Sequence, residues 1–236
     1  MKKILFSLFL LATYTVSAQK TINDPNAEAR AVSSFHALQI SHAFDVVLTQ
    51  GNEEGLAVSA NDKEDIPKIK TSVENGTLRI WFDEDKKWWP KNRKLKAYVS
   101  VKSLDLIKAG GATDINIEGG LKVPSLKLEL SGASDLEGML TVSGEMSVRL
   151  SGASDITISG AADKVTIDAS GASDVKAFDF TANTCSVDAS GASSVRITAD
   201  KEMSVKLSGA SSVNYKGNAS IRDIKTSGAS SISRKS

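Results

Sequence analysis

The chain is poor in the side chains that build metal centres and disulfide scaffolds. Of its 236 residues one is cysteine and two are histidine, and aromatic residues make up only 6%. Structural zinc sites, iron–sulfur clusters and disulfide frameworks are therefore excluded. The chain also lacks an excess of charge of either sign, because 29 Lys and Arg stand against 28 Asp and Glu. With no basic field to hold a phosphate backbone, the sequence predicts no nucleic-acid partner.

The longest hydrophobic run lies at the N-terminus. Lys2 and Lys3 precede an apolar run over residues 4–12, which is too short to cross a bilayer, and the small residues Val16-Ser17-Ala18 follow. We predict a signal peptide over residues 1–18, with a single membrane anchor as the alternative. We expect no membrane span after cleavage, and a location in the periplasm, at the cell surface or outside the cell. A linker over 19–34 is expected to lead to a β region over 35–107 and to regular repeats over 108–236.

The C-terminal half of the chain repeats itself. A Ser-Gly-Ala-Ser pattern, or a close variant, returns seven times, and its central glycines recur every 18 to 21 residues, at Gly111, Gly132, Gly152, Gly171, Gly191, Gly209 and Gly228. Inside each repeat apolar and polar residues alternate, as in Leu126-Lys127-Leu128-Glu129-Leu130, which is the period of a strand. The pattern predicts an all-β fold, a right-handed single-stranded parallel β-helix (solenoid) of about 20-residue coils.

The same alternation predicts the core and the corners. Inward residues of successive coils are expected to stack in columns about 4.8 Å apart, and Cys185 falls in one of these columns as a small buried hydrophobe. Gly and Ala leave room for the backbone to turn, and the flanking serines can bond to the backbone. No Gly-Xaa-Ser-Xaa-Gly elbow occurs and no histidine follows His42. The serines are therefore predicted to be structural, and no residue is assigned as catalytic.

Residues 35–107 alternate like strands but lack the regular period. Asn75-Gly76 indicates a hairpin, residues 62–67 a brief helical turn or loop, and Ser41-His42-Ala43 a degenerate corner with His42 in the glycine position. We expect longer, irregular coils or a cap that covers the N-terminal end of the solenoid, because an open stack of strands leaves an exposed edge. A separate small β domain is the alternative.

These segments together resemble a known family. The order of Phe44-Asp45-Val46-Val47-Leu48-Thr49-Gln50-Gly51, the hairpin with Gly76-Thr77-Leu78, residues 94–99 and the serial corners ending in Tyr215-Lys216-Gly217-Asn218 is similar to the family described as putative auto-transporter adhesin, head GIN domain. The resemblance covers nearly all of the mature chain. It implies a parallel β-helix that is exported to the periplasm or cell surface, typical of Bacteroidetes, with no established enzyme chemistry. Nothing in the chain matches an outer-membrane translocator, which the family description suggests.

The corners also align acidic residues. In-register stacking would place Asp114, Asp135, Asp155 and Asp174 in a column about 4.8 Å apart, followed by Ser194, Ser212 and Ser231. Adjacent carboxylates at that spacing repel each other, by roughly 3 kcal/mol at an effective dielectric constant near 20. A divalent cation such as Ca²⁺ would relieve the repulsion. Alternatively the side chains extend into water and accept N–H bonds at the corner, which we favour because the calcium-roll spacing is absent. The sequence predicts no other cofactor.

The second candidate site is an aromatic patch. Trp88 and Trp89 lie among charged residues, where exposed indoles could stack on sugar rings or anchor a protein partner, and Trp81 would extend that surface. The alternative is that the two indoles plug the capped end of the solenoid. His36 and His42 are only six residues apart, but no third ligand is evident for a metal or acid/base site.

We therefore predict an exported, non-enzymatic β-helix protein, an adhesin that binds a cell-envelope or extracellular glycan or protein through its surface. One alternative is a carbohydrate-active enzyme, a polysaccharide lyase or hydrolase, which would need acidic or basic groups in a cleft on one face. The other is a structural or assembly role in the envelope, with the edge near Ile232 docking against another copy.

Overall fold

The computed structural model of the protein describes residues 23–83 and 93–235. These residues form a continuous assembly of β-strands with one short 3-10 helix, η1 (Lys63–Lys68). The strands are β1 (Glu28–Arg30), β2 (Ala37–Ile40), β3 (Phe44–Gln50), β4 (Gly55–Ala60), β5 (Ile69–Glu74), β6 (Thr77–Phe82), β7 (Leu95–Val101), β8 (Leu106–Ala109), β9 (Asp114–Val123), β10 (Leu126–Leu130), β11 (Asp135–Leu150), β12 (Asp155–Ala169), β13 (Asp174–Ala189), β14 (Ser194–Leu207), β15 (Ser212–Lys216), β16 (Ser220–Thr226) and β17 (Ser231–Arg234).

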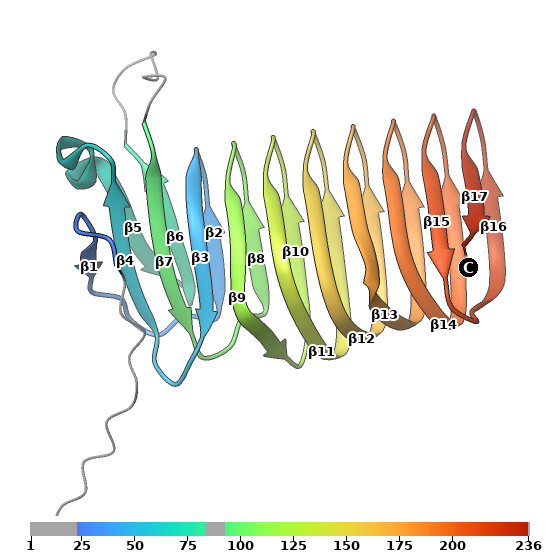
Figure 1. The fold of residues 1–236 in the computed structure, drawn as a ribbon, viewed down its shortest axis with the longest axis horizontal. Helices are drawn as coiled ribbons and strands as arrows, with labels where there is room; N and C mark the ends of the chain where they lie inside the picture. Colours follow the sequence, from blue (N-terminus) through green and yellow to red (C-terminus); the bar gives the residue numbers. More distant parts are fainter. Residues whose placement is uncertain (1–22, 84–92, 236) are drawn as a thin grey trace, which may run out of the picture.

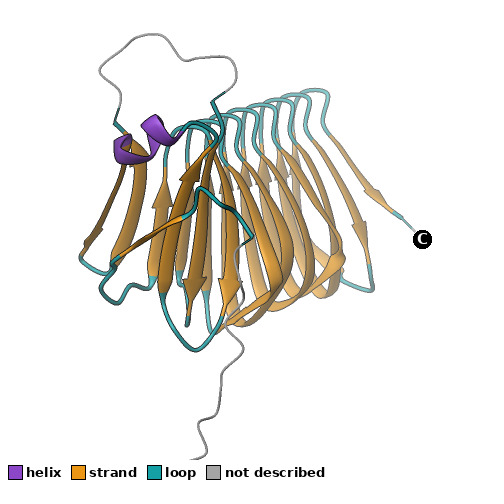
Figure 2. Ribbon diagram, turned by 60° about the vertical axis from the view of Figure 1, so that its left-hand side comes forward, coloured by secondary structure: helices purple, strands orange, loops and turns teal. Residues whose placement is uncertain are grey.

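The strands build the predicted solenoid of stacked parallel coils (Figure 1). Layer 1 contains, in order, β5, β6, β2, β8, β10, the second halves of β11 to β14, and β16, and all of these except the antiparallel β5 run toward the corners. Layer 2 contains, in order, β1, β4, β7, β3, β9, the first halves of β11 to β14, β15 and β17, and all of these except the antiparallel β4 run away from the corners. The two layers enclose the core between them (Figure 2).

The core consists of the predicted columns of like side chains. Leu128, Val148, Ile167, Val187 and Val205 are in register from coil to coil, and each is at most 3% exposed. Cys185 occupies the neighbouring column and is 1% exposed, so the prediction of a buried hydrophobe is confirmed. Burial raises the pKa of its thiol to about 12, which keeps the group protonated.

The Ser-Gly-Ala-Ser segments form the corners along one edge of the solenoid. Gly152 has a φ of +81°, which glycine adopts readily, and a Cβ there would lie 2.4 Å from the carbonyl oxygen of Gly132. The next corner residue, Ala153, donates its N–H to that same oxygen at 2.7 Å. Ser154 is fully buried and donates its hydroxyl to the carbonyl of Ser151 at 3.0 Å. The serines are thus engaged in holding the corner.

The N-terminal region is part of the same solenoid. His42 has a φ of +80° and occupies the glycine position of a corner between β2 and β3. This coil lies between the coil of β6 and β7 and the coil of β8 and β9, so the spatial order differs from the chain order. Beyond β6 and β7 the antiparallel strands β5, β4 and β1 cover the end of the stack. The hairpin at Asn75-Gly76 and the helical turn are both present, the turn as η1.

A buried ion pair fixes this cap. Asp65 of η1 accepts hydrogen bonds from Lys68 Nζ at 2.7 Å and from Arg93 Nε at 2.8 Å. The Arg93 guanidinium also lies 4.5 Å from the centre of the Phe82 ring. Burial raises the pKa of Asp65, but the two hydrogen bonds and positive charges outweigh it and leave the pKa below its usual range. The carboxylate therefore stays ionised and ties η1 to the start of β7.

The opposite end of the stack is more open. In the last coil Ile224 stands in the column of Ile167 and Val205, but it is 47% exposed. Ile221 and Ile232 are partly buried in neighbouring columns. Within the described residues no further strand covers β16 and β17.

We expect Gly152→Ala to destabilise the fold far more than Gly119→Ala. Both glycines have positive φ, which costs an alanine about 1–2 kcal/mol, but nothing lies within 4 Å of a Cβ at Gly119. At Gly152 the overlap with Gly132 raises the total to about 3 kcal/mol or more. Urea unfolding of both variants measures the difference, and equal losses would refute the close approach of the corners.

We expect Ile167→Ala to cost about 3 kcal/mol, because it leaves a cavity in a closed part of the column. Ile224→Ala removes the same atoms from the same column, and it should cost about 1 kcal/mol or less because water already reaches the side chain. Thermal and urea unfolding check the pair. A loss at Ile224 as large as that at Ile167 would show that this end of the stack is covered in solution.

Candidate functional site

The acidic column forms on the outer face of layer 2 and is longer than the sequence pattern indicated. Asp114, Asp135, Asp155 and Asp174 are in register, and Asp45 of β3 pairs with Asp114 to add a fifth carboxylate. The signal for Asp45 was present in the sequence, because it lies three residues after His42, as each other aspartate lies three after a glycine. The column continues with the predicted serines.

The C-terminal half of the column is neutralised by the protein. Asp155 and Asp174 lie within 3.1 Å of Lys176 Nζ and 3.3 Å of Arg196 Nη1, respectively. Each of these two aspartates also donates its backbone N–H to a carboxylate oxygen of the preceding coil, Asp135 Oδ1 at 3.3 Å and Asp155 Oδ1 at 3.2 Å. Corner N–H groups and basic side chains therefore offset much of the repulsion without a metal ion.

The N-terminal half of the column has less compensation. Asp114 forms no ion pair within the described part of the chain, and its pKa is raised by burial first and then by the charges of Asp135 and Asp45. Among residues 23–83 and 93–235, no group of three or more His, Cys, Asp or Glu side chains is placed to hold a metal ion. A Ca²⁺ site in the column stays a prediction.

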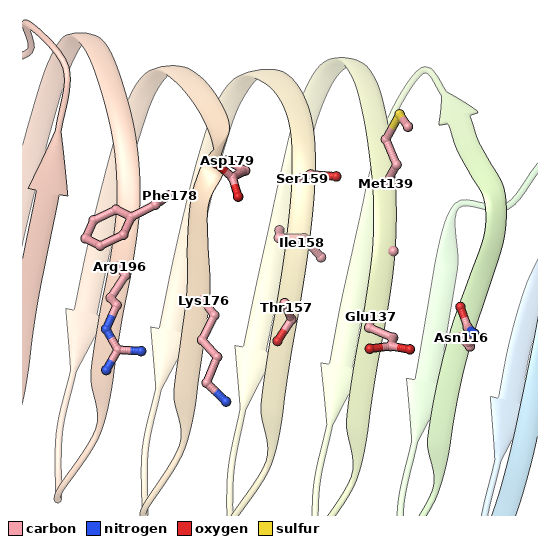
Figure 3. A pocket seen from close by; sticks show the side chains of 11 residues that line it. Asn116, Glu137, Met139, Thr157, Ile158, Ser159, Lys176, Phe178, Asp179 and Arg196 are labelled. Carbon is pink, nitrogen blue, oxygen red and sulfur yellow. The ribbon is translucent and has the colours of Figure 1, made fainter.

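A groove runs along this same face of layer 2. It consists of two adjoining hollows of about 650 Å³ and about 590 Å³, which share Asn116, Glu137, Thr157 and Lys176. One hollow follows the acidic column as far as Asp45, Lys96 and Tyr98. The other extends toward β13 and β14, where Lys176, Phe178, Asp179 and Arg196 line it (Figure 3). The groove is thus an open surface of polar and apolar side chains that crosses several coils.

Irregular strand pairing adds apolar side chains to this groove. Residues 178–180 of β13 have no counterpart in β14, where the register moves from Ala177↔Ile197 directly to Thr181↔Thr198. The resulting bulge places Phe178 half-buried on the outer surface, with Lys216 Nζ 5.2 Å from the ring centre. Met139 of β11 is 52% exposed and lines the same hollow. Sequence analysis missed both residues, because bulges disturb the alternation that identifies outward positions.

Trp81, the one residue of the predicted aromatic patch that the structure describes, lies apart from the groove. Trp81 is half-buried on the outer face of β6 in layer 1, opposite Lys70 of β5. Trp88 and Trp89 lie outside the described residues. The acidic column and Trp81 belong to different layers.

The two histidines do not form a site together. His36 Nδ1 is 2.9 Å from Asp105 Oδ2, whereas His42 Nδ1 is 3.2 Å from Ser41 Oγ. They lie at opposite ends of β2, about 20 Å apart for six residues of extended chain. They are the only two histidines of the chain, and neither lines the groove.

The groove also contains a tyrosine, Tyr98, whose hydroxyl is engaged. Tyr98 donates to Asp24 Oδ2 at 2.8 Å, and burial together with that carboxylate raises the pKa of Tyr98 to about 12.

We expect Asp114→Asn to raise the melting temperature slightly at pH 7. The pKa of Asp114 is raised in the folded state, so folding favours the protonated acid and ionisation costs stability. This penalty is absent below the ordinary pKa of 3.8 and complete once the pH exceeds the folded-state pKa. The gain should therefore vanish at pH 3. Calorimetry at both pH values tests this, and Asp168→Asn, which removes a partner of Arg149 in layer 1, should give no gain.

Comparison with known proteins agrees with the architecture. The chain aligns with a crystal structure described as a putative adhesin from Bacteroides fragilis NCTC 9343 with a TM-score of 0.82, at 22% identity, over 89% of this chain and 96% of that one. A putative lipid binding protein from Parabacteroides distasonis ATCC 8503 gives 0.67 at 19% identity, over 90% and 98%. A putative adhesin from Parabacteroides merdae ATCC 43184 gives 0.64 at 16% identity, over 89% and 96%. The TM-scores establish that these proteins share the fold of this chain.

None of the curated proteins matches the chain. The sequence pattern of one family, however, matches residues 34–219, which include β2 to β15 and all but the last of the corners. The chain therefore belongs to the family described as putative auto-transporter adhesin, head GIN domain.

Proposed function

We propose that this protein is an exported, non-enzymatic binding protein of the cell envelope, which holds an envelope or extracellular glycan or protein in the groove of layer 2. One observation carries the proposal. The groove extends from Asp45 to Arg196 across consecutive coils, and polar side chains line it from one end to the other. A long polar groove on a rigid scaffold suits an extended ligand that makes many weak contacts.

The state of the polar groups supports binding more than catalysis. Lys176 lies within ion-pair distance of Asp155 and Asp174, and Arg196 within that of Asp174, so these charges are already oriented. The phenol of Tyr98 is held protonated, and the corner serines donate to main-chain carbonyls. Oriented side chains of this kind supply hydrogen bonds to a ligand without rearrangement.

Export is supported by the N-terminal segment and by the family. Residues 1–18 have the charge and length of a signal peptide, and the family and two of the structural neighbours are described as adhesins. In the described part of the chain, no helix has the length and apolar character needed to cross a membrane. The signal-peptide pattern and the family description together support a location in the periplasm, at the cell surface or outside the cell.

One observation favours the carbohydrate-active enzyme as the second candidate. Asp114, whose pKa is raised above its ordinary value, lies beside Asp135 in the groove, and glycoside hydrolysis uses two neighbouring carboxyl groups of which one has a raised pKa. The open surface around them argues against it, since such chemistry needs a substrate enclosed between the two groups. A turnover assay decides between the candidates.

Retention of the purified chain on immobilised envelope polysaccharides, envelope proteins and lipid vesicles tests the proposal. The variant Lys176→Ala/Arg196→Ala should bind the retained partner at least tenfold more weakly. The matched control is Arg149→Ala/Lys206→Ala, which removes one arginine and one lysine from ion pairs on the outer face of layer 1. It should bind like the wild type.

The same retention assay, with product release measured in parallel, distinguishes binding in the groove from catalysis and from cation binding. Equal loss in both variants, or no retention of the wild type, would overturn the groove as the binding surface. Product release that disappears in Asp114→Asn would replace the binding protein by an enzyme. Retention that needs Ca²⁺ and is lost in Asp135→Asn/Asp155→Asn would assign a cation to the acidic column.

A further inference from the structure

We propose that Phe178 is the platform of a subsite for one uncharged sugar ring, so that the ligand of the groove is a glycan with neutral hexose or N-acetylhexosamine units. The inference rests on the proposed binding function and assigns the chemical class of the ligand. It starts from the bulge in β13, which adds an aromatic side chain to the groove at the end opposite Tyr98.

The bulge has no evident role in packing the core. Residues 178–180 have no paired counterparts in the next coil, because β14 continues directly from Ile197 to Thr198. Phe180 turns inward and is fully buried, so it already fills the core position. Phe178 is turned outward into the groove (Figure 3). The bulge is nevertheless ordered, because Thr198 Oγ1 donates to the carbonyl of Phe178 at 2.7 Å. Bulges of this kind commonly re-aim a side chain beside a functional site.

The surroundings of the ring match the surface of a sugar. A pyranose presents C–H groups on its faces and hydroxyls on its rim. An aromatic ring can contact the faces, and planar polar side chains can pair with the rim. Lys176, Asp179 and Arg196 lie around Phe178 in Figure 3, and Asn116 and Glu137 follow farther along the same hollow. They provide both hydrogen-bond donors and acceptors.

The balanced charge of the side chains that line the hollow favours a neutral ligand. Two acidic side chains, Glu137 and Asp179, and two basic ones, Lys176 and Arg196, line it together with uncharged Asn, Thr and Ser. The ammonium of Lys216 lies outside this lining, 5.2 Å from the centre of the Phe178 ring, where it can donate a hydrogen bond to a sugar hydroxyl. An anionic ligand would have to displace Asp155 and Asp174 from these basic groups. Uncharged hydroxyls can bond to the same side chains while the ion pairs persist. A fatty acyl chain would meet too little apolar surface, since only Met139, Ile158 and Phe178 contribute large apolar side chains to this hollow.

Binding of the full chain to a panel of soluble uncharged oligosaccharides tests the subsite. Calorimetry or NMR titration should identify at least one ligand, and Phe178→Ala should weaken it about tenfold, the loss expected when one stacking contact is removed. Phe178→Tyr retains the ring and should stay within about twofold of the wild type. Trp81→Ala removes an equally half-buried aromatic residue from layer 1 and should have no effect.

The outcomes separate this inference from the proposed function. If the wild type binds no uncharged oligosaccharide, but its retention on an envelope partner still depends on Lys176 and Arg196, the sugar subsite is wrong and the groove remains the binding surface. Binding that survives Phe178→Ala also refutes the subsite. Weaker oligosaccharide binding by Phe178→Ala supports the subsite when Phe178→Tyr binds like the wild type and Phe178→Ala unfolds at the wild-type temperature. Equally weak binding by both variants would refute stacking on the ring.

Discussion

The close approach of backbones at the glycine corners is the constraint on which the structure depends. A Cβ at Gly132, Gly152 or Gly171 would lie 2.3–2.4 Å from the carbonyl oxygen of the preceding corner, so only glycine permits the stack. The alanine after each of these glycines donates an N–H to that oxygen at 2.7 Å, which fixes the position of each coil on the last. Because strands on both sides leave the corner in register, this one contact aligns the core columns and the surface rows alike.

In-register stacking also repeats each surface residue, and with it each charge. In the middle of layer 1 the charges alternate, as Lys108, Glu129, Arg149 and Asp168 are successive members of one row and each neighbouring pair forms an ion pair. Farther along the row Asp188 lies beside Asp168 but is paired with Lys206. Layer 2 instead repeats aspartate, and its repulsion is offset only toward the C-terminal end. The two faces therefore differ in what they offer a ligand: layer 1 is paired within itself, whereas layer 2 retains polar groups along a groove.

The binding properties that we propose arise where the repeat is broken. A perfect solenoid would present flat, uniform rows, and uniform rows distinguish poorly among ligands. The insertion in β13 and the shift between β9 and β11 raise Phe178 and Met139 above this plane and create a hollow between coils. These irregularities do not disturb the stacking of the next corner, because the strand register is restored within a few residues of each bulge.

Repetition made much of this protein readable from its sequence. The seven glycines and the alternation between them were enough to predict the solenoid, its core columns with the buried Cys185, and the carboxylate row, because each depends on local geometry repeated at a constant period. The sequence also carried the signal for Asp45, which lies three residues after His42. Two features required the tertiary structure: the placement of the β2–β3 coil between coils that follow it in the chain, which brings Asp45 beside Asp114, and the exposure of Phe178. Each results from hydrogen bonds between strands distant in sequence or from a bulge that shifts the alternation. A pattern of residue types along the chain encodes which face a regular strand buries, but not which strand will become its neighbour.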